Sequence, residues 1–223
     1  MKTRSNMDRT ALLAEFFPEA PQAFFDRLLE PRRQRLFHSE ELLYSKGHPV
    51  EGLHLMFDGI ARLEIDQSAG IDWALPGDWL GMVDLIQNRP HSHNARVHSA
   101  DLNSCYLDRE SFYDLFAGFP QIGLPILQRL TSNVGRVERW MSGWKGSGVD
   151  TRLESMFEVL NQRFGSDAEG FLKLQVNPGQ MAAWIGANRT TVYRQLKKLQ
   201  LLGRIEIDQS RVRLLQWAEP KGE

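Results

Sequence analysis

The sequence is poor in cysteine: its one cysteine, Cys105, leaves no partner for a disulfide within the chain. One cysteine is also too few for a four-cysteine zinc site or a cysteine-ligated iron–sulfur cluster. Cys105 lies among apolar neighbours in the segment LNSCYLD, so we expect it to be a small, buried, structural side chain.

Long hydrophobic runs and an excess of positive charge are also missing. No segment approaches the roughly 20 apolar residues that span a bilayer, and the N-terminal residues lack the apolar core of a secretion signal. These absences predict a cytoplasmic protein without membrane contact. Lysine and arginine number 27 against 28 acidic residues, so any contact with nucleic acid must come from a local basic patch.

What is present is enough apolar material for one large domain or two modest ones, at 42% of 223 residues. Residues 36–107 contain short segments with the alternation of half-buried strands, separated by glycine and turn residues. In one of them, Ala61, Leu63 and Ile65 are expected to face inward. The opposite face would carry Arg62, Glu64 and Asp66. Several such strands predict a sandwich or roll, preceded by short helices that break at Pro18, Pro21 and Pro31.

A long helix is predicted over residues 120–145. Its apolar residues are spaced alternately three and four apart, at Leu127, Leu130, Val134, Val137, Met141 and Trp144. This is the spacing of a coiled-coil seam, and we interpret it as the interface of a two-fold homodimer. The alternative is that the stripe packs on the β-domain of its own chain. Residues 146–150, GSGVD, then indicate a hinge before a second domain that begins with its own helix.

The second domain contains the signals of a helix-turn-helix. Asn177, Pro178 and Gln180 suit the start of a first helix that would end at Ile185. Gly186 provides the turn and Asn188 caps a second helix, whose inner face would be Val192, Leu196 and Leu199. The segment RIEIDQSRVRLL that follows predicts a small hairpin, which makes the domain a winged helix.

The outward face of the second helix is basic and polar. An α-helix fits the major groove of DNA, where arginine can pair with guanine and threonine can contact a base or a thymine methyl. We therefore expect the DNA-contacting residues to be Gln180, Asn188, Arg189, Thr190, Thr191, Tyr193, Arg194 and Lys197. Lys198 and the hairpin residues Arg211 and Arg213 would contact phosphates. The alternative is that these charges only form a solvated helix face.

Taken together, these motifs resemble the Crp-Fnr family of bacterial transcription regulators over nearly the whole chain. The segment LLYSKGHPVEGLHLMFDGIARLE is similar to the family's β-roll signature, and PGDWLG to its later glycine-aspartate step. IGANRTTVYRQLKKLQLLGRI resembles the family's helix-turn-helix. The resemblance implies base contacts by Arg189 and Arg194, but Thr190 stands where the family commonly has glutamate, so the family's best-known half-site does not carry over.

The resemblance also implies an effector pocket, and here the sequence departs from the pattern. Cyclic-nucleotide-binding members have a glutamate after the glycine matched by Gly81, and an arginine-serine pair further on. Those places hold Met82, and Ser92 with His93. Methionine accepts hydrogen bonds weakly and serine brings no cation to a phosphate, so cyclic AMP is not expected to bind. A rearranged loop carrying Arg89 or Arg96 is the alternative.

Other effectors remain open at this point. Haem would need axial ligands, for which the loop offers His91, His93 and His98, but histidines on a polar loop are more often solvated. We expect no metal and no cofactor, and leave open an unidentified small effector or none. A cupin-type enzyme would need ligands from separate strands, and no nucleophile-base arrangement is found, so no enzymatic activity is expected.

The sequence thus predicts an α+β protein in three parts. Residues 1–119 would form an antiparallel, cyclic-nucleotide-binding-like β-roll with N-terminal helices, residues 120–145 the dimerisation helix, and residues 146–223 the winged helix. Two recognition helices about 34 Å apart would enter successive major grooves of a pseudo-palindromic site, with the hinge setting their separation. The resemblance adds RNA polymerase as a partner to be recruited or blocked, and the alternative function is a cyclic-nucleotide- or haem-responsive regulator with a rearranged pocket.

Overall fold

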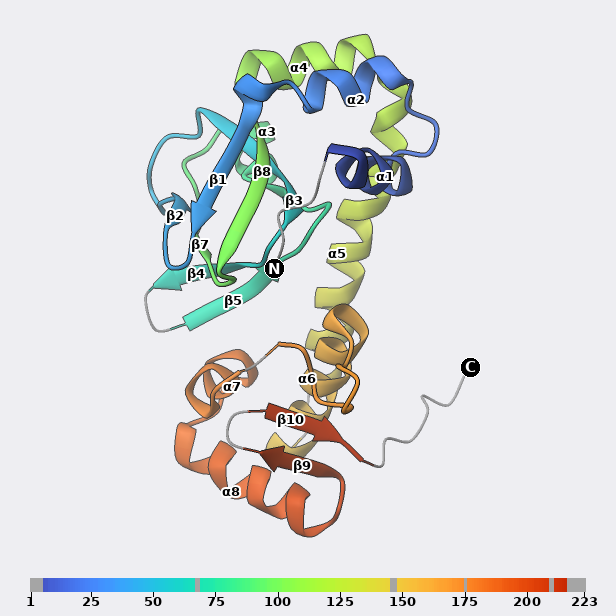
Figure 1. The fold of residues 1–223 in the computed structure, drawn as a ribbon. Coiled ribbons are helices and arrows are strands. Elements are labelled where there is room, and N and C mark those ends of the chain that lie inside the picture. The colour runs from blue at the N-terminus through green and yellow to red at the C-terminus, as the bar shows by residue number, and fades with distance from the viewer. Residues whose placement is uncertain (1–5, 67–68, 145–147, 175, 209–210, 216–223) are drawn as a thin grey trace. The chain divides into compact units, whose positions relative to one another are not determined.

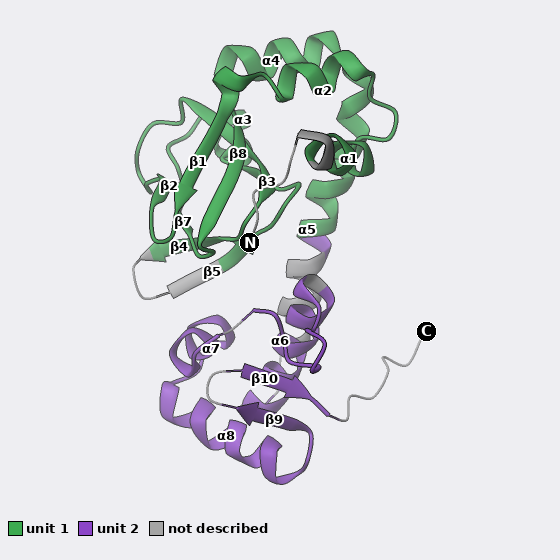
Figure 2. Cartoon of the chain, viewed as in Figure 1, with its two compact units in different colours: residues 1–133 green, residues 134–223 purple. Residues whose placement is uncertain are grey.

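The computed structural model describes residues 6–66, 69–144, 148–174, 176–208 and 211–215. The chain divides into two compact units, residues 1–133 and residues 134–223 (Figure 2). Each unit encloses buried apolar residues of its own. No helix in these described ranges combines the length and the apolar character needed to cross a membrane.

Two antiparallel four-stranded sheets form the first unit (Figure 1). One has the order β1-β8-β3-β6, with bounds Gln34–His38, Asp101–Asp108, Gly52–Asp58 and Trp79–Leu80. The other has the order β2-β7-β4-β5, with bounds Leu42–Tyr44, Asn94–Val97, Ala61–Asp66 and Ala69–Ala74. The predicted α+β class with an N-terminal antiparallel roll is confirmed.

Helices cover the outer face of the first sheet. They are α1 (Asn6–Phe16), α2 (Gln22–Leu28), α4 (Arg109–Gly118) and the start of α5 (Gly123–Trp144), with a short α3 (Met82–Ile86) after β6. Three-residue 3-10 turns lie at Pro31–Arg33 and Pro120–Ile122. Proline fixes its own φ and has no N–H to donate, and the observed helices end before Pro18 and Pro31 as predicted.

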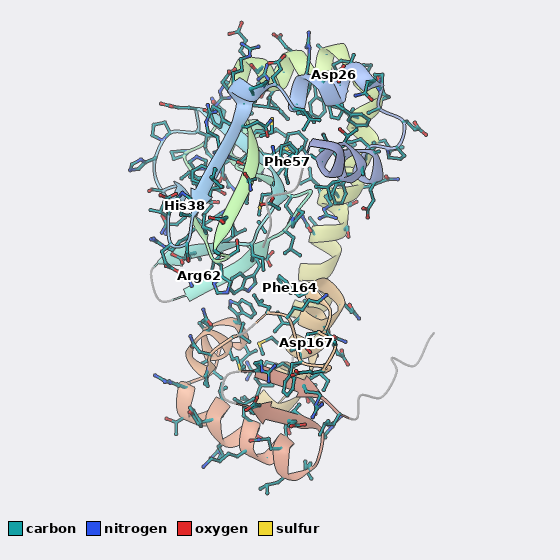
Figure 3. The ribbon with its side chains drawn as sticks, viewed as in Figure 1. Asp26, His38, Phe57, Arg62, Phe164 and Asp167 are labelled. Carbon is teal, nitrogen blue, oxygen red and sulfur yellow. The ribbon has the colours of Figure 1, made fainter. Side chains whose placement is uncertain are left out.

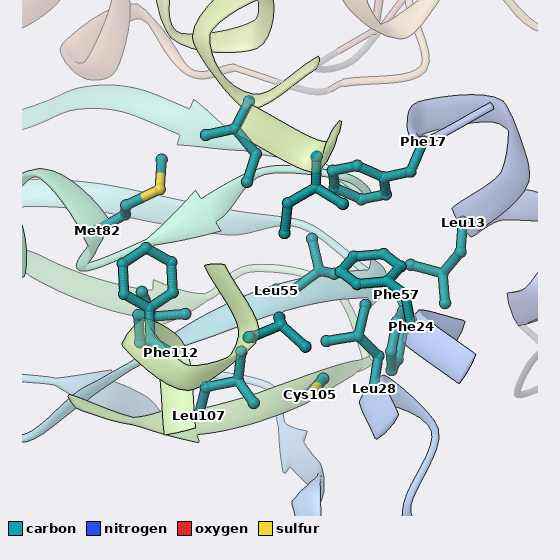
Figure 4. Packing of buried hydrophobic residues seen from close by; sticks show 14 of the residues in the cluster. Leu13, Phe17, Phe24, Leu28, Leu55, Phe57, Met82, Cys105, Leu107 and Phe112 are labelled. Carbon is teal, nitrogen blue, oxygen red and sulfur yellow. The ribbon is translucent and has the colours of Figure 1, made fainter. Parts of the chain in front are cut away.

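Every residue of strand β3 is buried, and the strand contributes side chains to two apolar clusters of the roll. Leu53, Leu55 and Phe57 join the cluster under the helices, while Met56 joins the cluster between the two sheets. Figure 4 shows the first cluster, in which Phe24 and Leu28 from α2 lie with Leu55 and Phe57 from β3. Cys105 lies in the same cluster with no exposed surface, and burial raises the pKa of its thiol to about 12, so the expected structural role is confirmed.

Strand β4 departs from the predicted alternation. Glu64 is buried, with 1% of its surface exposed, whereas Ile65 is 48% exposed. The pairing of β4 with β5 shifts register on both sides of Glu64, and such irregularities re-aim side chains. The Glu64 carboxylate is held by Arg62 (labelled in Figure 3) and by Arg96, whose Nε lies 3.5 Å away. Simple alternation was therefore wrong here, because a bulge and an ion pair decide which side chain turns inward.

The first turns of α5 are tied to the roll through Arg129. Its Nε lies 3.1 Å from Oδ1 of the buried Asp78, and its Nη2 donates to the carbonyl of Pro76 at 3.3 Å. The guanidinium also lies over the Phe16 ring, 5.0 Å from its centre. These contacts fix the start of the long helix on the roll.

The second unit contains α6 (Val149–Phe164), α7 (Pro178–Ile185), α8 (Arg189–Leu201) and the antiparallel pair β9 (Ile205–Asp208) and β10 (Arg211–Leu214). The helix after the hinge and the hairpin are both confirmed. Arg152 of α6 donates from Nη1 to the Ile185 carbonyl at 2.8 Å, which satisfies the C-terminal end of α7. Gly146 and Ser147 of the predicted hinge lie outside the described residues.

Two glycines of the roll allow a matched test of its turns. Gly59 and Gly47 have nearly the same left-handed φ, +84° and +83°. A Cβ on Gly59 would lie 2.6 Å from the Asp101 carbonyl oxygen and 2.8 Å from Leu102 Cα, whereas one on Gly47 would meet nothing within 4 Å. We expect Gly47→Ala to lower the free energy of unfolding by about 1 kcal/mol and Gly59→Ala by at least about 3 kcal/mol.

Urea unfolding of the two variants, followed by circular dichroism, measures this difference. Equal losses would show that backbone strain alone, and not the approach of Gly59 to β8, sets the sequence requirement.

Candidate nucleic-acid interface and effector loop

The first helix of the candidate interface, α7, begins with a complete capping box. Asn177 Oδ1 accepts hydrogen bonds from the backbone N–H groups of Gly179 and Gln180 at 2.9 and 3.0 Å. Gln180 Oε1 in turn accepts from the Asn177 N–H at 2.9 Å. Both predicted roles in capping are confirmed. For Gln180 this leaves only the amide nitrogen to donate to a phosphate.

The turn and the second helix also form as predicted. Gly186 ends α7 with φ +62° and ψ +44°, and Asn188 caps α8 by accepting from the Thr191 N–H at 2.8 Å. Val192, Leu196 and Leu199 are buried, and seat α8 against the rest of the unit. The inner face is thus confirmed.

The outer face of α8 carries the candidate base-contacting residues. Arg189, Thr190, Tyr193, Arg194 and Lys197 are exposed, and Thr191 is half-buried. Among the residues that the structure describes, no ion pair or hydrogen bond engages the side chains of Arg189, Arg194 or Lys197. These cations are therefore available to an external anion.

Other cations near α8 are already paired. Lys198 Nζ lies 3.5 Å from Asp150 Oδ2 at the start of α6. Its charge is therefore partly neutralised within the unit, which reduces the phosphate-binding role expected for it.

The two arginines of the wing make contacts within their own unit. Arg211 pairs with Asp208 at 2.8 Å, with Glu169 at 2.9 Å and with Asp167 (Figure 3) at 3.9 Å. Arg213 pairs with Glu206 and donates to the Glu169 carbonyl, and both guanidiniums lie over the Phe171 ring. Each guanidinium is thus held by acidic and aromatic neighbours that are not obvious from the hairpin pattern, and the contact of these two arginines with phosphate stays a prediction.

The predicted seam on α5 is described only in its first half. Leu127 and Val134 are 58% and 57% exposed, and Leu124, which the seam did not include, is 65% exposed. Leu130 is half-buried and packs against the cluster of its own roll. Val137, Met141 and Trp144 lie outside the residues whose side chains the structure describes.

The candidate effector loop is the segment 87–93, which follows α3. It is held by a buried acid of that helix, Asp84. Its Oδ2 accepts from both the backbone N–H and the hydroxyl of Ser92 at 3.0 Å, and its Oδ1 accepts from Arg89 Nε at 2.7 Å. Burial raises the pKa of this carboxyl, but the bonds from Ser92 and Arg89 outweigh burial and hold the pKa below its ordinary value. Asp84 is therefore an ionised acceptor at neutral pH.

A chain of hydrogen bonds runs from Asp84 to the roll. Because Ser92 Oγ donates to Asp84, it accepts from His93 Nδ1–H at 2.9 Å, which leaves His93 Nε2 to accept the Tyr44 hydroxyl at 2.9 Å. Ser92 and His93, which the sequence predicted as pocket residues, thus lie together. Met82 does not join them: it is buried among the helix-covered cluster near Phe112 (Figure 4).

The arginines of the alternative loop arrangement are engaged elsewhere. Arg89 holds Asp84, and Arg96 donates to the Glu40 carbonyl at 2.7 Å and contacts Glu64. The donors around Ser92 thus meet a carboxylate of the protein itself.

The three histidines considered as haem ligands make separate contacts. His91 stacks on Tyr44 with ring centres 3.8 Å apart, His93 is bonded as above, and His98 packs edge-on against Trp73 at 4.6 Å. Within the described ranges, no three His, Cys, Asp or Glu side chains gather where they could hold a metal ion.

Comparison with known proteins places this geometry in a known architecture. Residues 34–118 match the family model of the cyclic nucleotide-binding domain. A comparison with curated proteins gives no significant match. Among solved structures, the c-di-GMP responsive global regulator CLP of Xanthomonas campestris superposes with a TM-score of 0.70 at 17% identity, covering 93% of this chain and 100% of that one.

Two further solved structures have a similar fold. FixK2 of Bradyrhizobium japonicum gives a TM-score of 0.65 at 18% identity, covering 81% of this chain and 91% of that one. A CRP/FNR family transcriptional regulator of Thermus thermophilus, TTHA1359, gives 0.65 at 18%, covering 82% and 93%. The fold is that of the CRP/FNR-type transcription regulators.

Within this CRP/FNR-type fold, the residue that sequence reasoning missed is Asp84. An acid inside the apolar segment MVDLI, eight residues before Ser92, was the available signal, because an acid on a short, otherwise apolar helix has to find donors if it is buried. Tyr44, at the other end of the hydrogen-bond chain, gave no comparable signal.

The effector loop gives a prediction for stability and its pH dependence. Asp84→Asn weakens the charge-assisted bond to Arg89, so we expect the free energy of unfolding at pH 7 to fall by about 2 kcal/mol. Because the folded-state pKa is lowered, the carboxylate's contribution is present above the ordinary value of 3.8 and is lost as the pH falls through the folded pKa.

Urea unfolding at pH 7 and in steps down to pH 3 tests this, with the exposed Asp114→Asn on α4 as the control. The gap between wild type and the Asp84 variant should close in acid. A gap that is absent at neutral pH, or that widens in acid, would contradict the assigned bonds.

Proposed function

We infer that the protein is a dimeric, sequence-specific DNA-binding transcription regulator of the CRP/FNR type, that it acts in the cytoplasm, and that it has no enzymatic activity. The observation that carries this is the outer face of α8. Among the described residues, Arg189, Arg194 and Lys197 are exposed and unpaired on the second helix of a helix-turn-helix, while the wing arginines are paired.

The chemistry of that face suits a major groove. Arg189 and Thr190 lie in the first turn of α8, which reaches the base edges when a recognition helix docks, and Arg194 follows about one turn later. Arginine offers a planar pair of donors to guanine, whereas Lys197 suits a phosphate as a point charge. The side-chain oxygens of Gln180 and Asn188 accept backbone N–H groups in the caps. Their amide N–H groups would therefore donate to the backbone of DNA.

Dimerisation would place two such helices on one face of the duplex. Leu124, Leu127 and Val134 expose apolar surface on one helix, and positions seven apart share a helix face. A second copy of α5 is the partner that would bury this surface, and a two-fold pair of α8 helices would read a pseudo-palindromic site.

The proposed regulator does not use cyclic AMP as its signal. Asp84 already satisfies the Ser92 donors and Arg89, so a cyclic phosphate would have to displace an internal carboxylate and leave it buried without partners. Haem is equally unsupported, since the candidate histidines make other contacts. RNA polymerase is the remaining proposed partner, through surfaces that have no motif.

Sequence preference is first obtained by selecting bound duplexes from a random pool of about 30 base pairs, and fluorescence anisotropy then gives affinities. We expect Arg194→Ala to weaken the selected duplex by about 1 to 3 kcal/mol and to relax the preference at one base pair of each half-site. Lys197→Ala should weaken all duplexes alike and lower the slope of log K against log salt by about one per subunit.

Lys198→Ala is the matched control, because Asp150 already neutralises part of that charge, and it should change the salt slope less than Lys197→Ala. Failure to enrich any duplex, or identical specificity loss in the Arg194 and Lys197 variants, would refute the proposed interface.

The dimer is tested by placing a charge in the exposed apolar surface. Leu127→Glu should shift the protein to monomer in analytical ultracentrifugation and reduce DNA affinity at least tenfold, because a buried unpaired carboxylate opposes helix pairing. Leu201→Glu is the control for the ultracentrifugation, because this leucine is 89% exposed at the end of α8 and lies outside the predicted seam. A Leu127→Glu protein that stays dimeric would mean that another surface forms the interface.

A further inference from the structure

A polar pocket opens on the roll beside the effector loop. It has a volume of about 280 Å³ and lies between the segment after β2, the start of β3, the end of β8 and His91. Its lining is Leu43, Tyr44, Ser45, His48, Pro49, Glu51, Gly52, His54, His91 and Tyr106. Neither Met82, Ser92 nor His93 lines it, so the pocket is separate from the position matched to a cyclic phosphate.

The pocket wall has unused hydrogen-bonding groups. His91 is 6% exposed and its Nδ1 is buried without a hydrogen-bond partner among the described residues. His54 is 7% exposed and bonds Ser104 through Nδ1, at 3.0 Å, which leaves its Nε2. Buried polar groups in proteins are nearly always paired, so the unpaired ring nitrogen of a residue that lines the pocket indicates a partner that the described residues do not supply.

Charge decides which ligands fit. Burial lowers the pKa of His54 to about 4 and also lowers the pKa of His91, so both rings are neutral at pH 7. Glu51 is the acid among the lining residues, and none of them is lysine or arginine. Arg35 lies close by, but its guanidinium is held over the Tyr106 ring and donates to the Arg32 carbonyl at 2.7 Å. The lining therefore offers no lysine or arginine to an anionic ligand.

Shape adds a second restriction. Tyr44, His91, His54 and Tyr106 contribute flat rings, with Pro49 beside them. A cavity of about 150 Å³ holds benzene, and drug-sized sites begin near roughly 300 Å³, so about 280 Å³ suits one or two fused rings.

We propose that this pocket binds a small, flat, uncharged or singly cationic nitrogen heterocycle that donates an N–H group. A ring nitrogen of the ligand pairs with the unpartnered His91 nitrogen, and its N–H donates to the Glu51 carboxylate. The ligand's faces pack on the tyrosine and histidine rings.

The test is isothermal titration calorimetry of the full chain with benzimidazole, with saturation-transfer NMR as a second readout. 1-Methylbenzimidazole lacks the N–H donor, and benzoate is a flat anion of similar size. We expect benzimidazole to bind in the millimolar range or tighter, 1-methylbenzimidazole about tenfold more weakly, and benzoate not at all, since one lost hydrogen bond corresponds to roughly tenfold in affinity.

The variants separate recognition from stability. His91→Phe keeps the stack on Tyr44 and removes the unpaired nitrogen, so it should fold at least as well as wild type and lose benzimidazole affinity at least tenfold. Glu51→Gln, at an exposed position, should weaken binding without affecting folding. His98→Phe, a half-buried histidine of the same roll that does not line the pocket, is the control and should bind normally.

Absence of benzimidazole binding at 10 mM, tighter binding of benzoate, or unchanged affinity in His91→Phe would each overturn the proposal. Because none of these measurements involves DNA, the result does not depend on the proposed regulatory function.

Discussion

The seating of α8 by its three buried aliphatic residues is the constraint on which the functional face depends. Val192, Leu196 and Leu199 follow helical spacing, so fixing them on the core fixes which side chains point outward. The caps at Asn177 and Asn188 and the left-handed turn at Gly186 then set where each helix begins and ends. Each of these features is local, and each agrees with the others, which is why one short stretch of sequence specifies the whole motif.

The distribution of paired and unpaired cations separates structure from function in this chain. In the roll, Arg62 and Arg96 hold Glu64, Arg89 holds Asp84, and Arg129 holds Asp78. In the wing, Arg211 and Arg213 are held by acids and an aromatic ring. On the outer face of α8, by contrast, Arg189, Arg194 and Lys197 lie together with no ion pair among the described residues. A chain of net charge −1 thus presents a local group of positive charges on one helix face.

The fold was predictable from sequence where periodicity and end signals decide the structure, and less so where ion pairs do. The roll, the long helix, the capping box and the wing follow from alternation, proline positions and caps. Glu64 was assigned to the wrong face because the alternating pattern does not reveal the register shifts beside it. Nor does the pattern reveal the ion pairs that Glu64 forms with Arg62 of β4 and Arg96 of β7. Asp84 was missed for a related reason: its donors come from a loop eight residues away, and only the folded loop shows that an internal anion occupies them.

The same internal anion sets the direction of the hydrogen bonds that run from the effector loop to the roll. An ionised Asp84 can only accept, so Ser92 must donate to it, His93 must present its proton to Ser92, and Tyr44 must donate to His93. Tyr44 also stacks on His91, which lines the neighbouring pocket. A ligand in that pocket would therefore contact Tyr44, whose ring stacks on His91 and whose hydroxyl donates to His93. Such a ligand could alter the loop only if it binds one arrangement of Tyr44 and His91 more tightly than another. The coupling between the pocket and the loop is therefore set by the difference between these two affinities.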